Sequence, residues 1–324
     1  MQLYRVRLSL SVFFLVVSAG LWSTQHLTAQ RLDGALLNNL EYREIGPTRQ
    51  SGRFVDIAVP NQRPYTFYIA TASGGLWKTE NNGITFDVLF TDQDVFSIGA
   101  ITVAPSDPDI LYLGSGEANN SRSSYWGDGV YKSTNAGESW IHLGLPESHH
   151  IGRIVVHPSN PDIVYVAALG YLYSENEERG LYKTTDGGDS WIRVLGPEVE
   201  GRRIGVVDVV MDPSDTQTLY AATYDKVRLP FTFDLGGPGS RLYKSTNGGD
   251  SWIQLGAGLP EGMLGRIGVD VYERDPSIIY VTIENANKND MSEEERRQEL
   301  LDHESSRGMI GGEVYRSDDA GITW

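Results

Sequence analysis

The 324-residue sequence contains no cysteine. This excludes a disulfide-held scaffold, a thiolate metal site and a lipid attached through cysteine, so stability must come from a packed core. Basic residues are also scarce, with 27 Lys and Arg against 43 Asp and Glu and a net charge of −16. We expect no nucleic-acid partner, because an acidic chain is repelled by phosphate backbones.

Several catalytic signatures are absent as well. The sequence has no zinc-protease helix motif, no nucleophile elbow and no phosphate-binding glycine loop. The adjacent pair His149 and His150 has no third ligand at metal-binding spacing, and surface-loop histidines are the alternative interpretation. We therefore expect no metal and no cofactor.

The first thirty residues have the pattern of a secretory signal peptide. Arg5 and Arg7 precede an apolar run over residues 8–21, and small residues follow, with cleavage possible after Ala19 or Ala29. The run is short for a membrane span, so we expect none after the signal is removed. The sequence thus predicts a secreted or periplasmic protein of bacterial type, with residues 1–30 removed and residues 31–324 forming one domain.

Five copies of one motif run through that domain. Each reads Ser/Thr-x-Asp/Asn-x-Gly-x-Ser/Thr-aromatic, at residues 79–86, 133–140, 184–191, 245–252 and 317–324. The Asp or Asn side chain accepts backbone N–H bonds within a turn, and the glycine takes a conformation that other residues avoid. Each motif therefore predicts a hairpin.

Short strands surround every motif. An aromatic followed by a base precedes it, as in residues 76–78 and 130–132, and two further strands come before these, as in residues 98–103 and 110–113. We name the four strands of a unit A to D, from inner to outer. Such radial repeats predict an all-β fold, a β-propeller of four-stranded antiparallel blades.

Residues 42–47 read like a D strand that follows no motif. They would complete the last blade of a closed five-bladed ring, but Trp324 already stands where a D strand opens. We favour the other interpretation, an incomplete ring of about five blades, truncated within blade five.

The lengths of the connections indicate a binding face. A tyrosine in each B strand lies 30 to 34 residues after the preceding motif, but 13 to 39 residues before its own. The variation therefore lies in the B–C connections, which share one face with the D–A loops. Ligands are expected there, because function is grafted onto a rigid scaffold through variable loops.

The connection over residues 117–128 is the best candidate site. It combines a carboxylate, amides, a base and an aromatic between glycines, in Glu117, Asn119, Asn120, Arg122, Trp126 and Asp128. The aromatics of residues 171–173 suit stacking on a sugar or a peptide. The alternative for residues 117–128 is a surface loop without a ligand, in which the Asp and Asn side chains bond their own backbone.

Arginines recur where the A strands begin. These are Arg53, Arg153, Arg203 and Arg266, which could converge near the axis to bind a carboxylate or could pair with structural acids. Of these we select Arg53 and Arg153, together with His149 in the D–A loop before Arg153. These three residues complete the candidate site.

The repeats resemble the Asp-box, or BNR-repeat, propellers, and among them the sortilin N-terminal type and the bacterial BNR-repeat glycosyl hydrolases. The resemblance covers essentially everything after residue 40. In xyloglucanase-type members it implies a catalytic aspartate just ahead of a Gly-Gly pair, where this sequence has Ala72. Sialidases carry an Arg-Ile-Pro signature that does not occur here.

We interpret the chain as an exported binding module of sortilin-like type that recognises a peptide or glycan, not itself an enzyme. The alternative is a glycoside hydrolase acting on a polysaccharide across the same face. No spacing marks a catalytic pair among the carboxylates available for it, which are Asp56, Glu117, Asp128, Asp208, Asp234 and Asp270.

Overall fold

A computed structural model describes residues 53–324, except 232, 235, 290–291 and 293–308. The expected signal peptide and the strand expected at residues 42–47 lie outside the described residues. Nearly all regular structure is β, and η2 (Pro146–Ser148) is a single 3-10 turn. No helix among the described residues has the length and apolar character needed to cross a bilayer.

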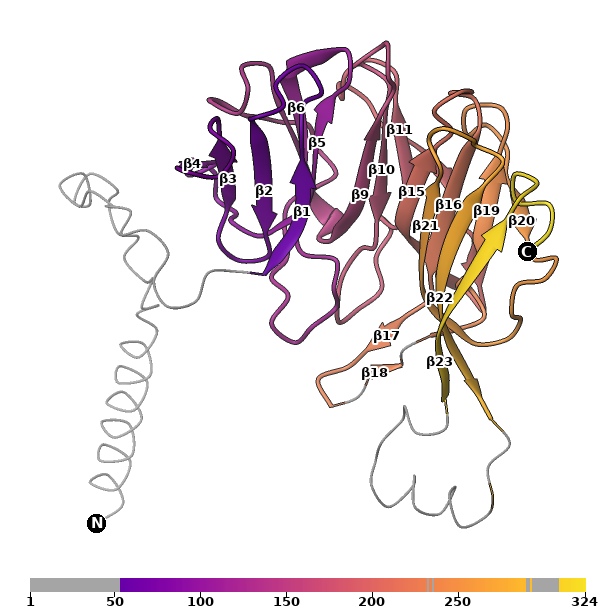
Figure 1. Ribbon diagram of the computed structural model, residues 1–324. Coiled ribbons are helices and arrows are strands. Elements are labelled where there is room, and N and C mark those ends of the chain that lie inside the picture. Colours follow the sequence, from indigo (N-terminus) through magenta and orange to yellow (C-terminus); the bar gives the residue numbers. More distant parts are fainter. Residues whose placement is uncertain (1–52, 232, 235, 290–291, 293–308) are drawn as a thin grey trace, which may run out of the picture. The chain divides into compact units, whose positions relative to one another are not determined.

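Five antiparallel sheets follow one another along the chain (Figure 1). The first four have four strands and the fifth has three, so the predicted β-propeller blades are confirmed. Their strands are β1 (Phe54–Ala58), β2 (Phe67–Thr71), β3 (Leu76–Thr79) and β4 (Asp87–Leu89); β5 (Ile98–Ala104), β6 (Asp107–Ser115), β7 (Val130–Ser133) and β8 (Ile141–His142); β9 (Ile151–Val156), β10 (Val164–Ala168), β11 (Gly180–Thr184) and β12 (Ile192–Leu195); β15 (Gly205–Met211), β16 (Leu219–Tyr224), β19 (Leu242–Ser245) and β20 (Ile253–Leu255); and β21 (Leu264–Val271), β22 (Ile279–Lys288) and β23 (Met309–Ser317).

Two small hairpins occur in the connections, one between the third and fourth sheets and one within the fourth. They are β13 (Glu198–Val199) with β14 (Arg202–Arg203), and β17 (Val227–Arg228) with β18 (Phe233–Asp234). The second hairpin belongs to a B–C connection and projects from the lower end of the sheets (Figure 1). The inner strands β1, β5, β9, β15 and β21 are successive neighbours, and buried apolar side chains fill the space between adjacent sheets.

Each Asp-box turn is held by the same hydrogen bonds. In the second box, Ser133 Oγ accepts the N–H groups of Asn135 (3.3 Å) and Gly137 (2.9 Å), and Asn135 Oδ1 accepts the N–H of Ser139 (2.9 Å). The other four boxes repeat this pattern. Gly137 has φ +91°, a conformation that favours glycine, so the spacing of the motif follows from the geometry of the turn.

Neighbouring blades are joined through the B-strand tyrosines. The Tyr165 hydroxyl donates to the Gly248 carbonyl of the next box (2.8 Å), and Tyr220 donates to Ala320 (3.0 Å). Lys183 and Lys244 donate to the same two carbonyls from above the tyrosine rings. In these two units the tyrosine of strand B and the lysine of strand C therefore join the blade to the following box.

Candidate functional site

Three connections meet at one cavity of about 420 Å³. They are the B–C loop after β6, the D–A loop that contains η2, and the B–C loop after β10. Two variable B–C loops and one D–A loop thus line the same cavity. We call this site the aromatic cavity; its ring-bearing walls include Tyr125, Trp126, His149, His150, Tyr171 and Tyr173.

Three of its rings are nearly parallel. His149 stacks on Tyr171 with centroids 3.9 Å apart and planes 27° apart. The Trp126 ring is inclined by 23° to the His149 ring, with centroids 6.4 Å apart. Trp126 is 65% exposed and Tyr173 is 43% exposed. Large apolar faces therefore remain open to solvent.

The backbone of the D–A loop directs His149 into the cavity. His149 has φ 50° and ψ −40°, and its carbonyl accepts the N–H of Gly127 (2.8 Å). A Cβ at Gly116 would lie only 1.7 Å from that carbonyl, so the close approach requires glycine there. The two loops are thereby locked together beneath the rings.

Buried cationic and titratable groups support the cavity from below. Lys226 and Arg179, 3% and 4% exposed, both donate to the Tyr171 carbonyl, at 3.2 and 3.0 Å. Burial lowers the pKa of Lys226 to about 7. His150 is also buried, and its Nδ1 donates to the Glu117 carbonyl (2.7 Å), because a carbonyl can only accept. Burial, and next the charge of Lys226, lower the pKa of His150 to about 4.

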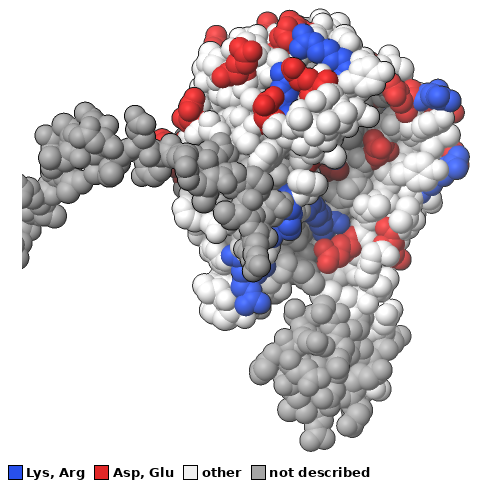
Figure 2. Space-filling model, turned by 60° about the vertical axis from the view of Figure 1, so that its left-hand side comes forward, with Lys and Arg blue, Asp and Glu red and all other residues white. Residues whose placement is uncertain are grey.

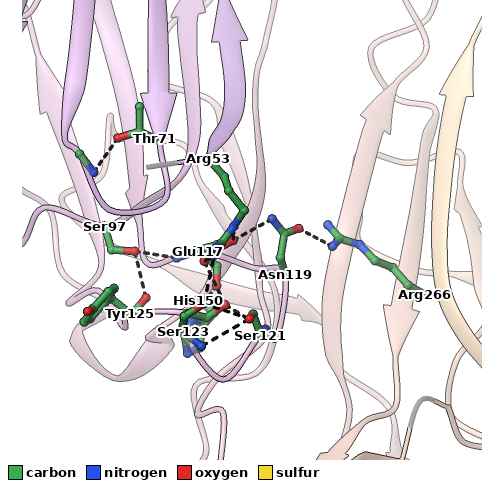
Figure 3. A network of polar contacts seen from close by, with 12 residues as sticks. Arg53, Thr71, Ser97, Glu117, Asn119, Ser121, Ser123, Tyr125, His150 and Arg266 are labelled. Carbon is green, nitrogen blue, oxygen red and sulfur yellow. Dashed lines mark hydrogen bonds and ion pairs between the residues drawn. The ribbon is translucent and has the colours of Figure 1, made fainter. Parts of the chain in front are cut away.

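Glu117 lies at the centre of a polar network (Figure 3). Its fully buried carboxylate pairs with the Arg53 guanidinium and accepts hydrogen bonds from Asn119 (2.9 Å) and Ser124 (3.0 Å). Burial alone would raise the pKa of Glu117, but these hydrogen bonds outweigh it and hold that pKa below its usual value. The carboxylate therefore anchors the loop.

Asn119 extends this network to another blade. Its Oδ1 accepts a hydrogen bond from Arg266 Nη1 of β21 at 2.9 Å, although the residues are 147 positions apart (Figure 3). The neighbouring Ala118 packs in the apolar cluster that includes Leu264. Asn120 is 3% exposed. The start of the 117–128 loop thus fills space between inner strands.

The remaining candidates separate into two groups. Arg122 and Trp126 line the aromatic cavity. Asp128 instead accepts the Tyr131 hydroxyl (2.8 Å) and the Ser115 hydroxyl (3.2 Å). Arg153 pairs with Asp208 (3.0 Å).

Asp56 and Asp208 join successive inner strands. Asp56 accepts the N–H of Ile101 (3.0 Å), and Asp208 accepts that of Val269 (3.1 Å). Burial raises the pKa of Asp56. Ala72, where the resemblance implies an acid, is fully buried.

A larger hollow of about 670 Å³ lies beside the β13–β14 and β17–β18 hairpins. Its lining includes the ion pair of Arg202 with Asp225 (2.9 Å), together with Met263 and Phe233, its one aromatic residue among those described. The smaller cavity has the denser set of rings and is the stronger candidate. On the face shown in Figure 2, acidic and basic side chains are interspersed.

Of the residues in and beneath the cavity, the sequence analysis proposed Trp126, His149 and the Tyr171 segment as binding residues but did not select Lys226, Arg179 or His150. Lys226 lies two residues after the end of β16 (Leu219–Tyr224), and its position next to this apolar strand is a sequence signal of its burial.

The comparisons with known proteins agree with this architecture. The sequence model of the Sortilin-Vps10 family, described as sortilin, neurotensin receptor 3, matches residues 128–307. A xyloglucanase of Paenibacillus sp is 26% identical over 249 residues, covering 67% of this chain and 22% of that protein. Xyloglucanase Xgh74A of Acetivibrio thermocellus is 27% identical over 204 residues, covering 55% and 22%. The chain therefore spans about a fifth of these relatives.

Two solved structures have a similar fold. The Niastella koreensis GH74 enzyme has a TM-score of 0.58 at 21% identity, covering 84% of this chain and 37% of that one. The GH74 xyloglucanase from Xanthomonas campestris has a TM-score of 0.57 at 18% identity, covering 84% and 38%.

Proposed function

This chain belongs to the Sortilin-Vps10 family, and from that premise we propose that it is part of a glycoside hydrolase that acts on a polysaccharide. In this proposal the aromatic cavity binds the sugar chain. The observation that carries the proposal is the gathering of rings in this cavity, where Trp126 and Tyr173 are exposed and Trp126 and Tyr171 both lie nearly parallel to His149. Apolar ring faces with a few polar groups beside them suit a ligand that has C–H faces and hydroxyl edges. The printed names of the relatives make xyloglucan the first polysaccharide to test.

We assign binding, and not bond cleavage, to the cavity. Glycoside hydrolysis requires two carboxyl groups roughly 5 to 9.5 Å apart, one of them protonated. No carboxylate is among the residues that line this cavity. Glu117 is engaged in an ion pair and its pKa is lowered, which disfavours a role as proton donor. In the proposed enzyme, cleavage uses carboxylates outside the aromatic cavity.

A peptide receptor is the second candidate, since Arg122 on the rim could pair with a peptide carboxylate. The parallel rings favour the sugar. We also propose that the protein is exported, since residues 1–30 have the signal pattern and polysaccharides are extracellular.

The test is binding of xyloglucan and of a peptide library to the full chain, by calorimetry and by affinity electrophoresis. We expect xyloglucan to bind and Tyr173→Ala to weaken that binding severalfold. Tyr65→Ala is the matched control, because Tyr65 is 67% exposed but lies in the A–B turn between β1 and β2. Binding of peptides and of no polysaccharide would refute the proposal. Release of reducing sugar that Glu117→Gln or Asp128→Asn abolishes, while xyloglucan binding and Tm stay unchanged, would refute the assignment of cleavage to other carboxylates.

A further inference from the structure

We infer that His150 is a specificity-determining residue of the aromatic cavity, whose Nε2 atom accepts a hydrogen bond from a hydroxyl group of the bound sugar. This inference rests on the proposed function and deepens it, because it names the atom through which the cavity would recognise a hydroxyl. His150 lines the cavity although only 1% of its surface is exposed.

The partner of Nδ1 determines which nitrogen of this imidazole carries the proton. Nδ1 lies 2.7 Å from the Glu117 carbonyl oxygen, which can only accept, so Nδ1 is the donor (Figure 3). Burial, and next the charge of Lys226, lower the pKa of His150 to about 4, so the ring carries no second proton at neutral pH. Nε2 therefore has a free lone pair and can only accept.

The lone pair of Nε2 is available to a ligand. Nε2 of His150 has no hydrogen-bond partner among the described residues. It is also not one of the unpartnered side-chain atoms of the described residues that are sealed from solvent. Nε2 therefore reaches accessible space, and the space that His150 borders is the aromatic cavity. An acceptor with so little access to solvent gains most from a donor that the ligand brings to it.

Three segments of the chain hold the imidazole in place. The N–H of His150 donates to the Ser148 carbonyl (2.5 Å), and its carbonyl accepts the N–H of Leu169, directly after β10 (2.9 Å). The ring is bonded to Glu117, whose own N–H donates to the Ser97 hydroxyl (3.1 Å). The acceptor is thus fixed before a ligand arrives, so binding does not have to order it.

The surroundings of His150 favour a sugar as the donor. The cavity walls combine aromatic rings with the hydroxyl-bearing residues Ser123, Ser124 and Ser174. The lone pair of Nε2 would repel a carboxylate oxygen, whereas a hydroxyl can donate to it. A sugar offers that hydroxyl together with apolar C–H faces for the rings.

A purely structural role for His150 predicts a different order of two variants. His150→Asn keeps a donor for the Glu117 carbonyl but has no acceptor at the position of Nε2. His150→Gln is longer, so its amide oxygen reaches that position, but it gives up the bond to Glu117. If the ring only anchors the loop, His150→Asn should bind the sugar better. If Nε2 contacts the ligand, His150→Gln should bind better.

The experiment measures binding of a xyloglucan oligosaccharide to the full chain by calorimetry, together with the Tm of each variant. We expect His150→Asn to have the higher Tm of the two variants and yet to bind about tenfold more weakly than the original protein. His150→Gln should bind within about threefold of the original protein. His157→Asn is the matched control and should bind normally, because His157 lies in the A–B turn between β9 and β10. Normal binding by His150→Asn, or weaker binding by His150→Gln than by His150→Asn, would overturn the inference.

Nitrogen NMR tests the same contact without a substitution. The chain has six histidines, and comparison with the spectrum of either variant identifies the ring signals of His150. We expect Nε2 to have the chemical shift of an unprotonated nitrogen and to move toward that of a protonated one when the oligosaccharide binds. A protonated Nε2 in the free protein, or no movement on binding, would overturn the inference and leave the proposed function standing. Failure of the original protein to bind would refute the proposed function itself.

Discussion

At the scale of single residues, the groups beneath the aromatic cavity combine burial with an incomplete balance of charge. His150 is 1% exposed, and burial keeps its imidazole neutral. The charge of the nearby Lys226 lowers the pKa of His150 further. Lys226 itself lies near Arg179 and Arg228. A second positive charge on His150 would be buried beside these cations. The fold therefore resists protonation of this imidazole.

Stability should consequently depend on pH. The unfolded chain protonates a histidine near pH 6.5 and the folded chain protonates His150 only near pH 4, so acidification across this range favours unfolding. From a shift of this size we expect the free energy of unfolding to fall by about 3 kcal/mol between pH 7 and pH 4, as measured by urea titration.

His150→Asn is the matched variant, because its amide can replace the Nδ1 donor to Glu117 but does not titrate. It should lose most of the pH dependence that His150 contributes. Equal slopes for the two proteins would contradict the assignment.

The sequence allowed the rings of the aromatic cavity to be proposed, but not the partners of Glu117. Trp126, His149 and Tyr171 could be found because aromatics and a histidine pair stand in variable connections of a repeated unit. The partners of Glu117 could not, since Arg53 is 64 positions away and several other arginines begin inner strands. Which arginine reaches Glu117 depends on how neighbouring blades are placed relative to one another, which local sequence patterns do not specify.

At the scale of elements, the B-strand tyrosines are the joints between blades. Tyr165 is 2% exposed and bonds a carbonyl of the next box, whereas Tyr280 in the last described sheet is 44% exposed and accepts a hydrogen bond from Arg316 (3.3 Å). The same motif position is thus a buried joint in one blade and a solvent-exposed group in another.

This difference predicts unequal effects of one substitution. Tyr165→Phe should lower the free energy of unfolding by about 1 kcal/mol, because a buried hydrogen bond is lost and the Gly248 carbonyl keeps only Lys183. Tyr280→Phe should have almost no effect. Chemical denaturation of both variants checks this, and equal losses would show that the joint is not the cause.

At the scale of the whole molecule, the repeat predicted the blades well. Its boxes, the strands flanking them and their order follow from turn chemistry and alternating apolar residues, which act locally. The bond between Asn119 and Arg266 was not predictable, because it joins the second blade to the fifth.

That bond should be detectable by hydrogen exchange. Arg266→Gln should speed exchange of β21 and β22 amides by about fivefold, the equivalent of about 1 kcal/mol in local opening. Arg274→Gln, in the exposed turn between the same two strands, should leave the rates unchanged. Unchanged rates in Arg266→Gln would mean that the contact contributes nothing to holding that sheet.

Arrays of repeats ordinarily transmit stability only from each unit to the next, so terminal units fray first. The hydrogen bond between Asn119 and Arg266 joins the second blade directly to the fifth. Detaching the fifth sheet therefore also requires this long-range contact to break. The fifth sheet should then open as rarely as the sheets in the middle of the array. A ligand that orders the second blade should also stabilise the fifth.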